Sequence, residues 1–199
     1  RDQFAVTLPL DIVFTAPSVK DLAQQIENKN PVDRQRFEIE ATGRKEGPLS
    51  FAQERLWYLE ALHPNALQES ICALFDCEGS LNESVLETAL KMMIASTPSL
   101  RTRFVEEGGV VTQVCADHAD FQLQRYEVEM GSELEDAKRE GLSLLQKVAL
   151  EKWDLGGNKS LMSVHRVHYG PSRFLVLFRF HHMIGDGWSL GLFFPQLYT

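Results

Sequence analysis

The sequence has few of the features that mark nucleic-acid-binding, membrane-bound or disulfide-rich proteins. Its 28 acidic residues outnumber its 20 Lys and Arg residues, for a formal net charge of −8, and no basic run exceeds two adjacent residues. A surface for nucleic acid or for an anionic membrane needs clustered positive charge. We therefore expect neither kind of partner, and we attribute the acidity to solubility.

Long apolar runs and cysteine pairs are also missing. No apolar run reaches the ~18 residues that cross a bilayer, and the N-terminus shows no signal-peptide pattern. The cysteines Cys72, Cys77 and Cys115 form no CxxC pair. We therefore expect reduced thiols in a cytoplasmic protein. Because the chain starts within a pattern, at Arg1-Asp2-Gln3, we interpret it as a segment of a longer protein.

The first part of the chain divides into a short helical segment and a linker. Residues 8–28 predict two short helices, the second capped by Ser18 with Asp21 three residues on. Residues 29–47 hold charged clusters and prolines with little apolar periodicity, which is typical of a linker. A globular pattern starts at residue 48 and continues to residue 199.

The globular pattern mixes helices and strands. The apolar periodicity predicts helices over residues 50–59, from Asn82 or from a Ser80–Glu83 capping box, from Ser132, and over 190–198. It predicts strands over residues 71–77, 160–168 and 173–181, and a hairpin over residues 100–114 that turns at Glu107-Gly108-Gly109. The order indicates an α+β fold, with a mixed β-sheet flanked by helices.

The most unusual stretch is the end of the strand 173–181. It is apolar on both faces, as in a central strand of a covered sheet, yet it leads into His181 and His182 and a loop with Asp186 and Gly187. Alternation places His182 on the face of Phe180, and His181 on the opposite face. A plain core strand needs no such pair, so His182 is the candidate functional side chain.

Other chemically suggestive residues have simpler explanations. His165 and His168 lie three apart on a predicted strand and so face opposite sides, which excludes a shared metal ion. Ser189 is not in a GxSxG turn, so it is not expected to be a hydrolase nucleophile. Trp57 and Trp188 are interpreted as core aromatics.

Four spaced motifs carry a family resemblance. His181 to Gly187 matches HHxxxDG, and Ser50 to Leu59 matches SxAQxRLWxL. Leu100 to Phe104 matches LRTxF, and Glu151 to Leu155 is similar to a PFDL segment. In this order the motifs resemble the condensation domain of nonribosomal peptide synthetases, within the wider fold family of chloramphenicol acetyltransferase.

The resemblance implies a domain organisation and partners. Residues 48–199 would be the N-terminal lobe of a condensation domain, which pairs with a C-terminal lobe. Residues 1–28 resemble the last helices of a peptidyl carrier domain. The expected partners are upstream and downstream carrier domains, whose thioesters are held on 4′-phosphopantetheine attached to a Ser outside this chain; the resemblance implies no directly bound cofactor or metal. A lone lobe is expected to be inactive and to self-associate through its uncovered face.

The resemblance also assigns roles at the site. The family joins an acyl or peptidyl thioester to an aminoacyl amine, and His182 would accept or orient the amine proton. His181 and Asp186 would support the site structurally, Asp186 through a buried ion pair with Arg101. Gly187 would let backbone or pantetheine approach closely. One departure is Ser96-Thr97-Pro98, where the family usually has Arg-His-Glu.

Two alternatives remain open from sequence. The first is another HxxxD acyltransferase of the same fold that uses a soluble thioester. The second is a non-catalytic interaction lobe. The carrier-like segment before residue 48 favours the condensation domain, whereas the absence of a second lobe from the sequence favours the non-catalytic lobe for this chain alone.

Overall fold

The computed structural model describes residues 8, 11–28, 43–62, 70–129 and 133–198. Two compact units make up the chain, residues 1–43 and residues 44–199. Most of the predicted linker, residues 29–47, lies outside the described residues.

The first unit contains the two short helices that the sequence predicts, α1 (Ile12–Thr15) and α2 (Val19–Glu27). The Ser18 hydroxyl accepts a hydrogen bond from the backbone N–H of Asp21 at 3.1 Å, as the capping pattern predicts. No described residue of α2 is buried, and Val19 is 87% exposed. The apolar side of α2 therefore has no core of its own within the described part of this unit.

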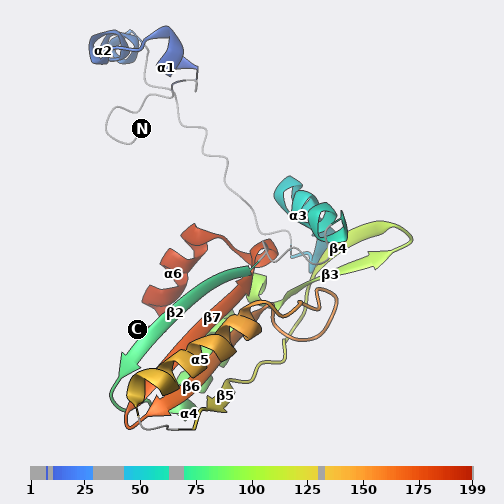
Figure 1. The fold of residues 1–199 in the computed structure, drawn as a ribbon. Coiled ribbons are helices and arrows are strands. Elements are labelled where there is room, and N and C mark those ends of the chain that lie inside the picture. The colour runs from blue at the N-terminus through green and yellow to red at the C-terminus, as the bar shows by residue number, and fades with distance from the viewer. Residues whose placement is uncertain (1–7, 9–10, 29–42, 63–69, 130–132, 199) are drawn as a thin grey trace. The chain divides into compact units, whose positions relative to one another are not determined.

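The second unit is built from helices and strands in mixed order (Figure 1). The helices are α3 (Phe51–Leu62), α4 (Glu83–Ser96), α5 (Leu134–Ala149) and α6 (Gly187–Leu197), with 3₁₀ turns η1 (Pro98–Arg101) and η2 (His182–Ile184). The strands are β1 (Glu46–Pro48), β2 (Ser70–Glu78), β3 (Thr102–Glu107), β4 (Val110–Cys115), β5 (Gln124–Glu127), β6 (Met162–Gly170) and β7 (Arg173–His181).

A four-stranded sheet in the order β2-β7-β6-β5 forms the centre of this unit. β7 runs antiparallel to both β2 and β6, whereas β5 and β6 are parallel, so the sheet is mixed as expected. β6 and β7 form a hairpin that turns at Pro171 and Ser172, where Ser172 has a φ of 53°. The strand with two apolar faces, β7, has a neighbour on either side, as the sequence predicts.

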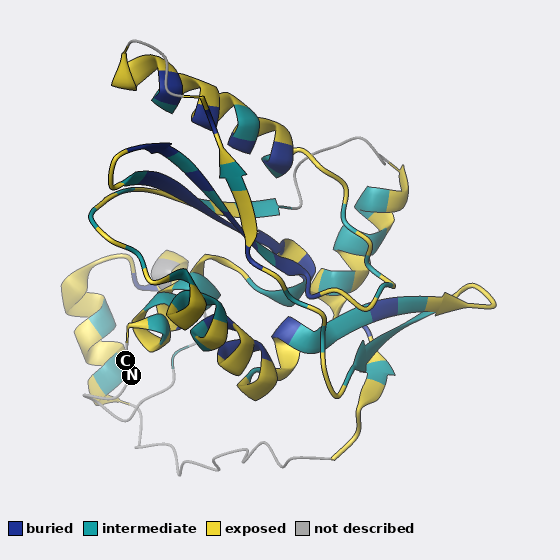
Figure 2. Ribbon diagram, turned by 90° about the horizontal axis from the view of Figure 1, so that it is seen from below, coloured by how far each residue is buried: buried dark blue, intermediate teal, exposed yellow. Residues whose placement is uncertain are grey.

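Both faces of the sheet are covered, which explains why β7 is apolar on both sides. On one face Val176, Phe178 and Phe180 share a cluster with buried residues of α4 and α6. On the other face Leu175 and Leu177 pack against α5. In Figure 2 the buried residues gather on the central strands and on the helix sides turned toward them.

A second sheet departs from the single sheet that the sequence predicts. It is three-stranded and antiparallel, in the order β1-β4-β3, and it contains the hairpin predicted over residues 100–114. The hairpin turns at Gly108 and Gly109, both with positive φ, 60° and 81°. Which strands pair depends on long-range contacts, and periodicity does not contain that information.

The helix starts can be compared with their predicted caps. Asn82 rather than the Ser80–Glu83 box caps α4, which was one of the two alternatives. The predicted cap Ser132 lies outside the described residues, and α5 follows Glu133, whose side chain makes no capping bond. Asp186 caps α6, which begins at Gly187 rather than at residue 190.

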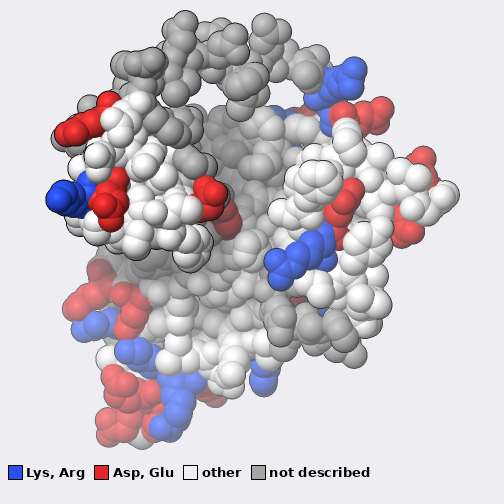
Figure 3. Space-filling view, turned by 90° about the horizontal axis from the view of Figure 1, so that it is seen from above, with Lys and Arg blue, Asp and Glu red and all other residues white. Residues whose placement is uncertain are grey.

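Among the described residues, no helix is both long and apolar enough to cross a membrane. Lys and Arg side chains are interspersed with acidic ones on the face seen in Figure 3, and no continuous basic surface forms there. Cys72, Cys77 and Cys115 are all free thiols, as expected.

Candidate functional site

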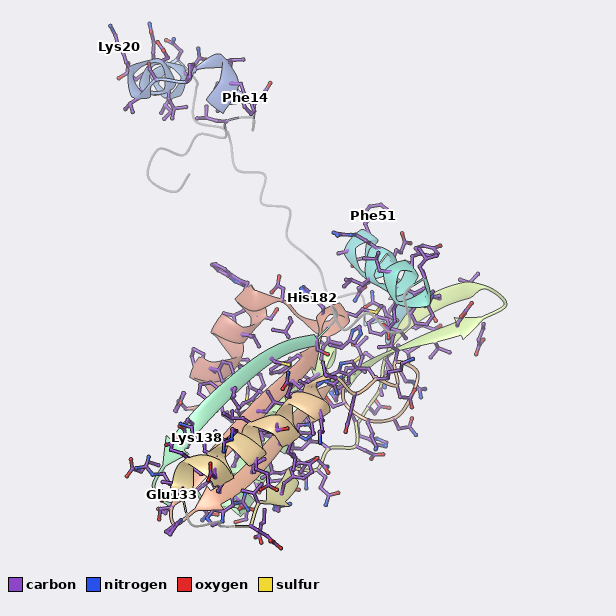
Figure 4. The ribbon with its side chains drawn as sticks, in the orientation of Figure 1. Phe14, Lys20, Phe51, Glu133, Lys138 and His182 are labelled. Atoms are coloured by element: carbon purple, nitrogen blue, oxygen red, sulfur yellow. The ribbon has the colours of Figure 1, made fainter. Side chains whose placement is uncertain are left out.

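The site lies where β7 ends and the chain turns into α6. Every residue from Phe174 to His181 is buried, whereas His182 is exposed. β7 stops at His181, because η2 starts at His182 and replaces the extended backbone with a 3₁₀ turn. Figure 4 shows His182 at this end of β7. The change of backbone at this point turns one histidine into the core and leaves the next at the surface.

His182 lines an open pocket of about 510 Å³. One wall comes from α3 and the residue before it, and the other from the turn and the start of α6. The lining residues are Ser50, Ala52, Gln53, Arg55, Leu56, Leu59, His182, Met183, Gly185, Asp186 and Ser189. No hydrogen bond joins the His182 ring to another residue in the described part of the chain. The imidazole is therefore available to a molecule that enters the pocket.

A second pocket lies across the 185–189 segment from the first. Its volume is about 240 Å³, and Gly185, Asp186 and Ser189 line both pockets. Its remaining lining is largely apolar and includes Phe180 and Phe193. The segment after His182 thus separates an open pocket that contains the imidazole from a smaller apolar one.

His181 is fully buried, and it holds the turn from inside. Its Nδ1 accepts a hydrogen bond from the backbone N–H of Met183 at 3.1 Å. Its Nε2 lies 3.2 Å from the Glu60 Oε2 of α3, in a contact too poorly aligned to count as a hydrogen bond. The Trp153 ring meets the His181 ring edge-on, with centroids 6.0 Å apart. These contacts agree with a structural role for His181.

Asp186 is exposed and caps α6. Its Oδ1 accepts hydrogen bonds from the backbone N–H and the hydroxyl of Ser189, both at 2.8 Å, and Ser189 Oγ accepts in return from the Asp186 N–H. These bonds from Ser189 hold the pKa of the Asp186 carboxyl below its usual value, and the nearby His182 lowers it further. The carboxylate therefore stays ionised beside the imidazole.

The predicted ion pair between Asp186 and Arg101 is wrong. Arg101 donates instead to backbone carbonyls: to Ile94 from Nε at 3.1 Å, and to Ala116 and Asp117 from Nη1. In the described residues no ion pair joins Arg101 to Asp186. Arg101 therefore ties the end of α4 to the segment after β4, and Asp186 fixes the loop through the helix cap.

Gly187 is the first residue of α6, and its φ is not in the left-handed region. A Cβ at this position would meet no atom within 4 Å. The backbone conformation therefore does not demand glycine here, and the space beside it is open. Gly185, in contrast, is close-packed, because a Cβ there would come within 3.2 Å of the Ser189 Cβ.

The interpretation of Trp188 as a core residue is wrong, and that of Trp57 is partly right. Trp188 is 80% exposed on the first turn of α6. Trp57 is half-buried and packs against a cluster that includes Leu49, Phe104 and Met183. No pattern in the sequence separates the two cases, because both residues are aromatic and both lie on helices.

Two residues of α3 that reach the turn were not predicted from the sequence. The Gln53 amide donates to the carbonyl of Met183 at 3.1 Å, and Glu60 faces His181. The sequence does indicate a capping role for Gln53, because Ser50 and Gln53 have the spacing of a capping box.

His165 and His168 were expected to face opposite sides of their strand, β6. In the described part of the chain, no cluster of His, Cys, Asp and Glu could hold a metal ion. Ser189, which was not expected to be a nucleophile, uses its hydroxyl in the α6 cap.

The family model of the condensation domain matches residues 43–199. The chain belongs to the condensation domain family. One linear gramicidin synthase subunit from Brevibacillus parabrevis is 31% identical over 202 residues, which cover 100% of this chain and 4% of that protein. A probable non-canonical nonribosomal peptide synthetase of Salinispora arenicola, CymA, is 34% identical over 196 residues, which cover 96% of this chain and 2% of that protein. This condensation domain chain therefore spans a small part of the length of such relatives.

Solved condensation domains share the fold. The starter condensation domain of rhizomide synthetase RzmA superposes with a TM-score of 0.68 at 19% identity, over 77% of this chain and 38% of that one. The first condensation domain of the calcium-dependent antibiotic synthetase gives a TM-score of 0.65 at 24% identity, over 76% and 36%. These neighbours confirm the α+β fold expected of a chloramphenicol acetyltransferase-like lobe.

Proposed function

We propose that this condensation domain lobe serves amide-bond formation in a nonribosomal peptide synthetase. An upstream carrier-bound acyl or peptidyl thioester would react with a downstream carrier-bound aminoacyl amine at His182. The observation that carries the proposal is the exposed imidazole of His182 in an open pocket of about 510 Å³, next to a buried, hydrogen-bonded His181. The family membership of the chain supports the reaction class.

The chemistry follows from what an imidazole in that place offers. The attacking amine must lose a proton as its nitrogen bonds to the thioester carbon, and the thiolate leaves when the tetrahedral intermediate collapses. The His182 ring has no hydrogen bond to another described residue, so it can accept or orient that proton. Asp186 stays ionised on the same loop.

The carrier partners would deliver their substrates on phosphopantetheine arms, and the pocket has room for such an arm. Gly187 follows the lining residue Asp186, and the space beside it is open, since a Cβ there would touch nothing within 4 Å. We propose Gly187, Asp186, His181 and Arg101 as structural support: Gly187 by leaving space, Asp186 by capping α6, His181 by holding the Met183 N–H, and Arg101 by tying α4 to the segment after β4.

The domain assignment is part of the proposal. Residues 1–28 would be the last helices of a carrier domain, residues 29–47 a linker, and residues 48–199 the N-terminal lobe. The support is the pair of short helices α1 and α2, and the alignment with the linear gramicidin synthase chain, which spans all of this one. A C-terminal lobe would complete the domain.

Self-association of the lone lobe is a further part of the proposal. The apolar side chains of Trp188, Leu192 and Tyr198 on and after α6 are exposed. Without a second lobe to cover such a surface, contact between two copies of the lobe would be favourable. Light scattering of the isolated chain tests this, and a clean monomer would contradict it.

Replacing His182 tests the proposed reaction. In the synthetase that contains this chain, His182→Ala is expected to lower the rate of dipeptide formation by roughly 10²–10⁴-fold, the range that a positioned acid–base group contributes. The rate is measured with both carriers loaded, and with a small soluble acyl thioester in place of the upstream carrier.

The control is His118→Ala, which removes another exposed histidine and is expected to leave the rate unchanged. A wild-type rate in His182→Ala would refute the assignment. Equal rates with the soluble thioester and with the loaded carrier would instead favour an acyltransferase that needs no upstream carrier.

A further inference from the structure

The backbone around His182 is held by side chains rather than by strand pairing. At the end of β7 the His181 N–H donates to the Leu161 carbonyl at 2.9 Å. Past that point, both hydrogen-bonding groups of the Met183 backbone have side-chain partners. His181 Nδ1 accepts from the N–H at 3.1 Å, and Gln53 Nε2 donates to the C=O at 3.1 Å.

Met183 itself is buried, with 3% of its surface exposed, among Leu49, Phe104 and Leu161. The residues on either side of His182 are therefore anchored, one fully buried at the end of β7 and the other in a core cluster. Between them, the His182 side chain lines the pocket. The direction of its ring depends on the backbone that follows it. His181 holds the N–H of the peptide group between His182 and Met183, and Gln53 holds the C=O of the next peptide group.

The Gln53 amide is oriented by its place in α3. Ser50 and Gln53 form a capping box: the Ser50 N–H donates to Gln53 Oε1 at 2.8 Å, and the Gln53 N–H donates to Ser50 Oγ at 3.3 Å. Because the amide oxygen is used by the cap, the amide nitrogen is directed away from it. That nitrogen reaches the Met183 carbonyl, and at 3.4 Å the Gln113 Oε1.

A capping box accepts either Glu or Gln at N3, the third residue of the helix, which is the position of Gln53 in α3. Only Gln supplies an N–H donor to the carbonyl of Met183, because an ionised Glu is acceptor-only. The cap therefore does not require an amide here, whereas the contact with the turn does.

Glu60 is the second contact from α3. His181 Nδ1 accepts from an N–H, so the proton of the neutral ring sits on Nε2, which faces Glu60 Oε2. The carboxylate favours that tautomer, and the tautomer leaves Nδ1 free to hold Met183. The contacts of Gln53 and Glu60 thus converge on the backbone of one residue, Met183, from one helix.

We infer that Gln53 is a positioning residue for His182, acting through the Met183 carbonyl, and that Glu60 assists by fixing the tautomer of His181. α3 acts as a clamp that sets the direction of the His182 ring. The inference rests on the proposed function, because it assigns a kinetic consequence to that direction. It predicts that loss of the Gln53 donor lowers kcat while substrate binding and the fold persist.

The decisive variant is Gln53→Glu, which keeps the capping box and removes the donor. In the intact synthetase, kcat for dipeptide formation is expected to fall by on the order of 10²-fold, as for a small misplacement of a catalytic group. The KM for each loaded carrier is expected to change less than kcat, because the Gln53 side chain, which lines the same pocket, acts on the imidazole through the Met183 carbonyl. The ¹H–¹³C ring signals of His182 are expected to shift.

Gln146→Glu is the matched control, since it makes the same charge change at an exposed position of α5. It is expected to leave kcat and the His182 ring signals unchanged. Glu60→Gln, which keeps an acceptor for His181, is expected to retain more of kcat than Glu60→Leu.

A wild-type kcat in Gln53→Glu overturns the inference. A fall in kcat that comes with a melting temperature lowered by about 10 °C or more also overturns it, because loss of one hydrogen bond lowers the melting temperature far less. The outcome for His182→Ala separates the two proposals. If that variant is active, the proposed function fails; if it is inactive while Gln53→Glu is fully active, only the clamp fails.

Discussion

His165 is a buried histidine whose environment keeps it neutral. It is 5% exposed on β6, its Nε2 lies 2.9 Å from Ser163 Oγ, and its Nδ1 lies 3.3 Å from the Tyr126 hydroxyl. Burial, and then the charge of Arg179, lower its pKa from 6.5 to about 4. Because the unfolded chain binds this proton more readily, the neutral ring stabilises the fold above pH 6.5, and this contribution is lost as the pH falls toward 4.

The first prediction is an acid sensitivity that depends on His165. Between pH 7 and pH 5 the protein is expected to lose about 2 kcal/mol of unfolding free energy through this residue, measured by urea unfolding at each pH. His165→Gln, which cannot be charged, is expected to reduce that loss, whereas the exposed His118→Gln is expected to keep it. Equal pH dependence in His165→Gln and wild type would rule out this cause.

At the scale of single residues, the sequence predicts the chemical role of a side chain better than it predicts the side chain's contacts in the fold. Opposite facing separates His181 from His182 but does not predict the exposure of His182, because both faces of β7 are covered and the exposure comes from the 3₁₀ turn that starts at His182. The partners Gln53 and Glu60 are not predicted either, since α3 and η2 are far apart in the sequence and meet only in the folded chain. Trp188 shows the same limit, because its exposure depends on which side of α6 the sheet covers.

At the scale of helices and strands, the helix caps depend only on residues that are close together in the sequence. Ser18, Asn82 and Asp186 each accept a hydrogen bond from the backbone N–H three residues on. Such signals lie within a few residues and are readable from sequence. The split of the strands into two sheets is not readable in this way, because β1 pairs with β4 and β2 pairs with β7 over long separations.

The second prediction concerns Asp186 and Arg101, which do not interact in the structure. Asp186→Ala is expected to lower the unfolding free energy, because the α6 cap is lost. Arg101→Ala is expected to lower the free energy of unfolding by about 2 kcal/mol, because its hydrogen bonds to three carbonyls are lost. The double variant is expected to equal the sum within about 0.5 kcal/mol.

Chemical denaturation of the four proteins in the cycle measures these values. Asp186→Asn keeps an acceptor for the cap and is expected to cost less than Asp186→Ala. A coupling energy well above about 0.5 kcal/mol would restore the ion pair that the sequence suggested.

On the scale of the whole molecule, the buried clusters lie in one of the two units. All three consist of buried residues between Leu49 and Phe193, so the second unit contains its own core. The first unit has two short helices, and α2 has no buried residue among those described. The chain divides at residue 43, within the segment 29–47 whose composition is typical of a linker.

The third prediction is that residues 44–199 fold without residues 1–43. Their melting temperature is expected to lie within a few degrees of that of the full chain, because the hydrophobic clusters are unchanged. Differential scanning calorimetry of the two proteins makes the comparison. A large loss of stability on removal of residues 1–43 would show that the first unit contributes to the core.

The pairing of β2 with β7 also sets when this protein can fold during its own synthesis. Ser70 is the partner of His181, so the central sheet stays open until the ribosome has released the strand that ends in the histidine pair. Chain growth proceeds from the N-terminus, which leaves the apolar strand β2 without its neighbour while the intervening residues are translated. β2 therefore stays unpaired with β7 over that interval, and the turn at His182 takes shape only as the sheet closes.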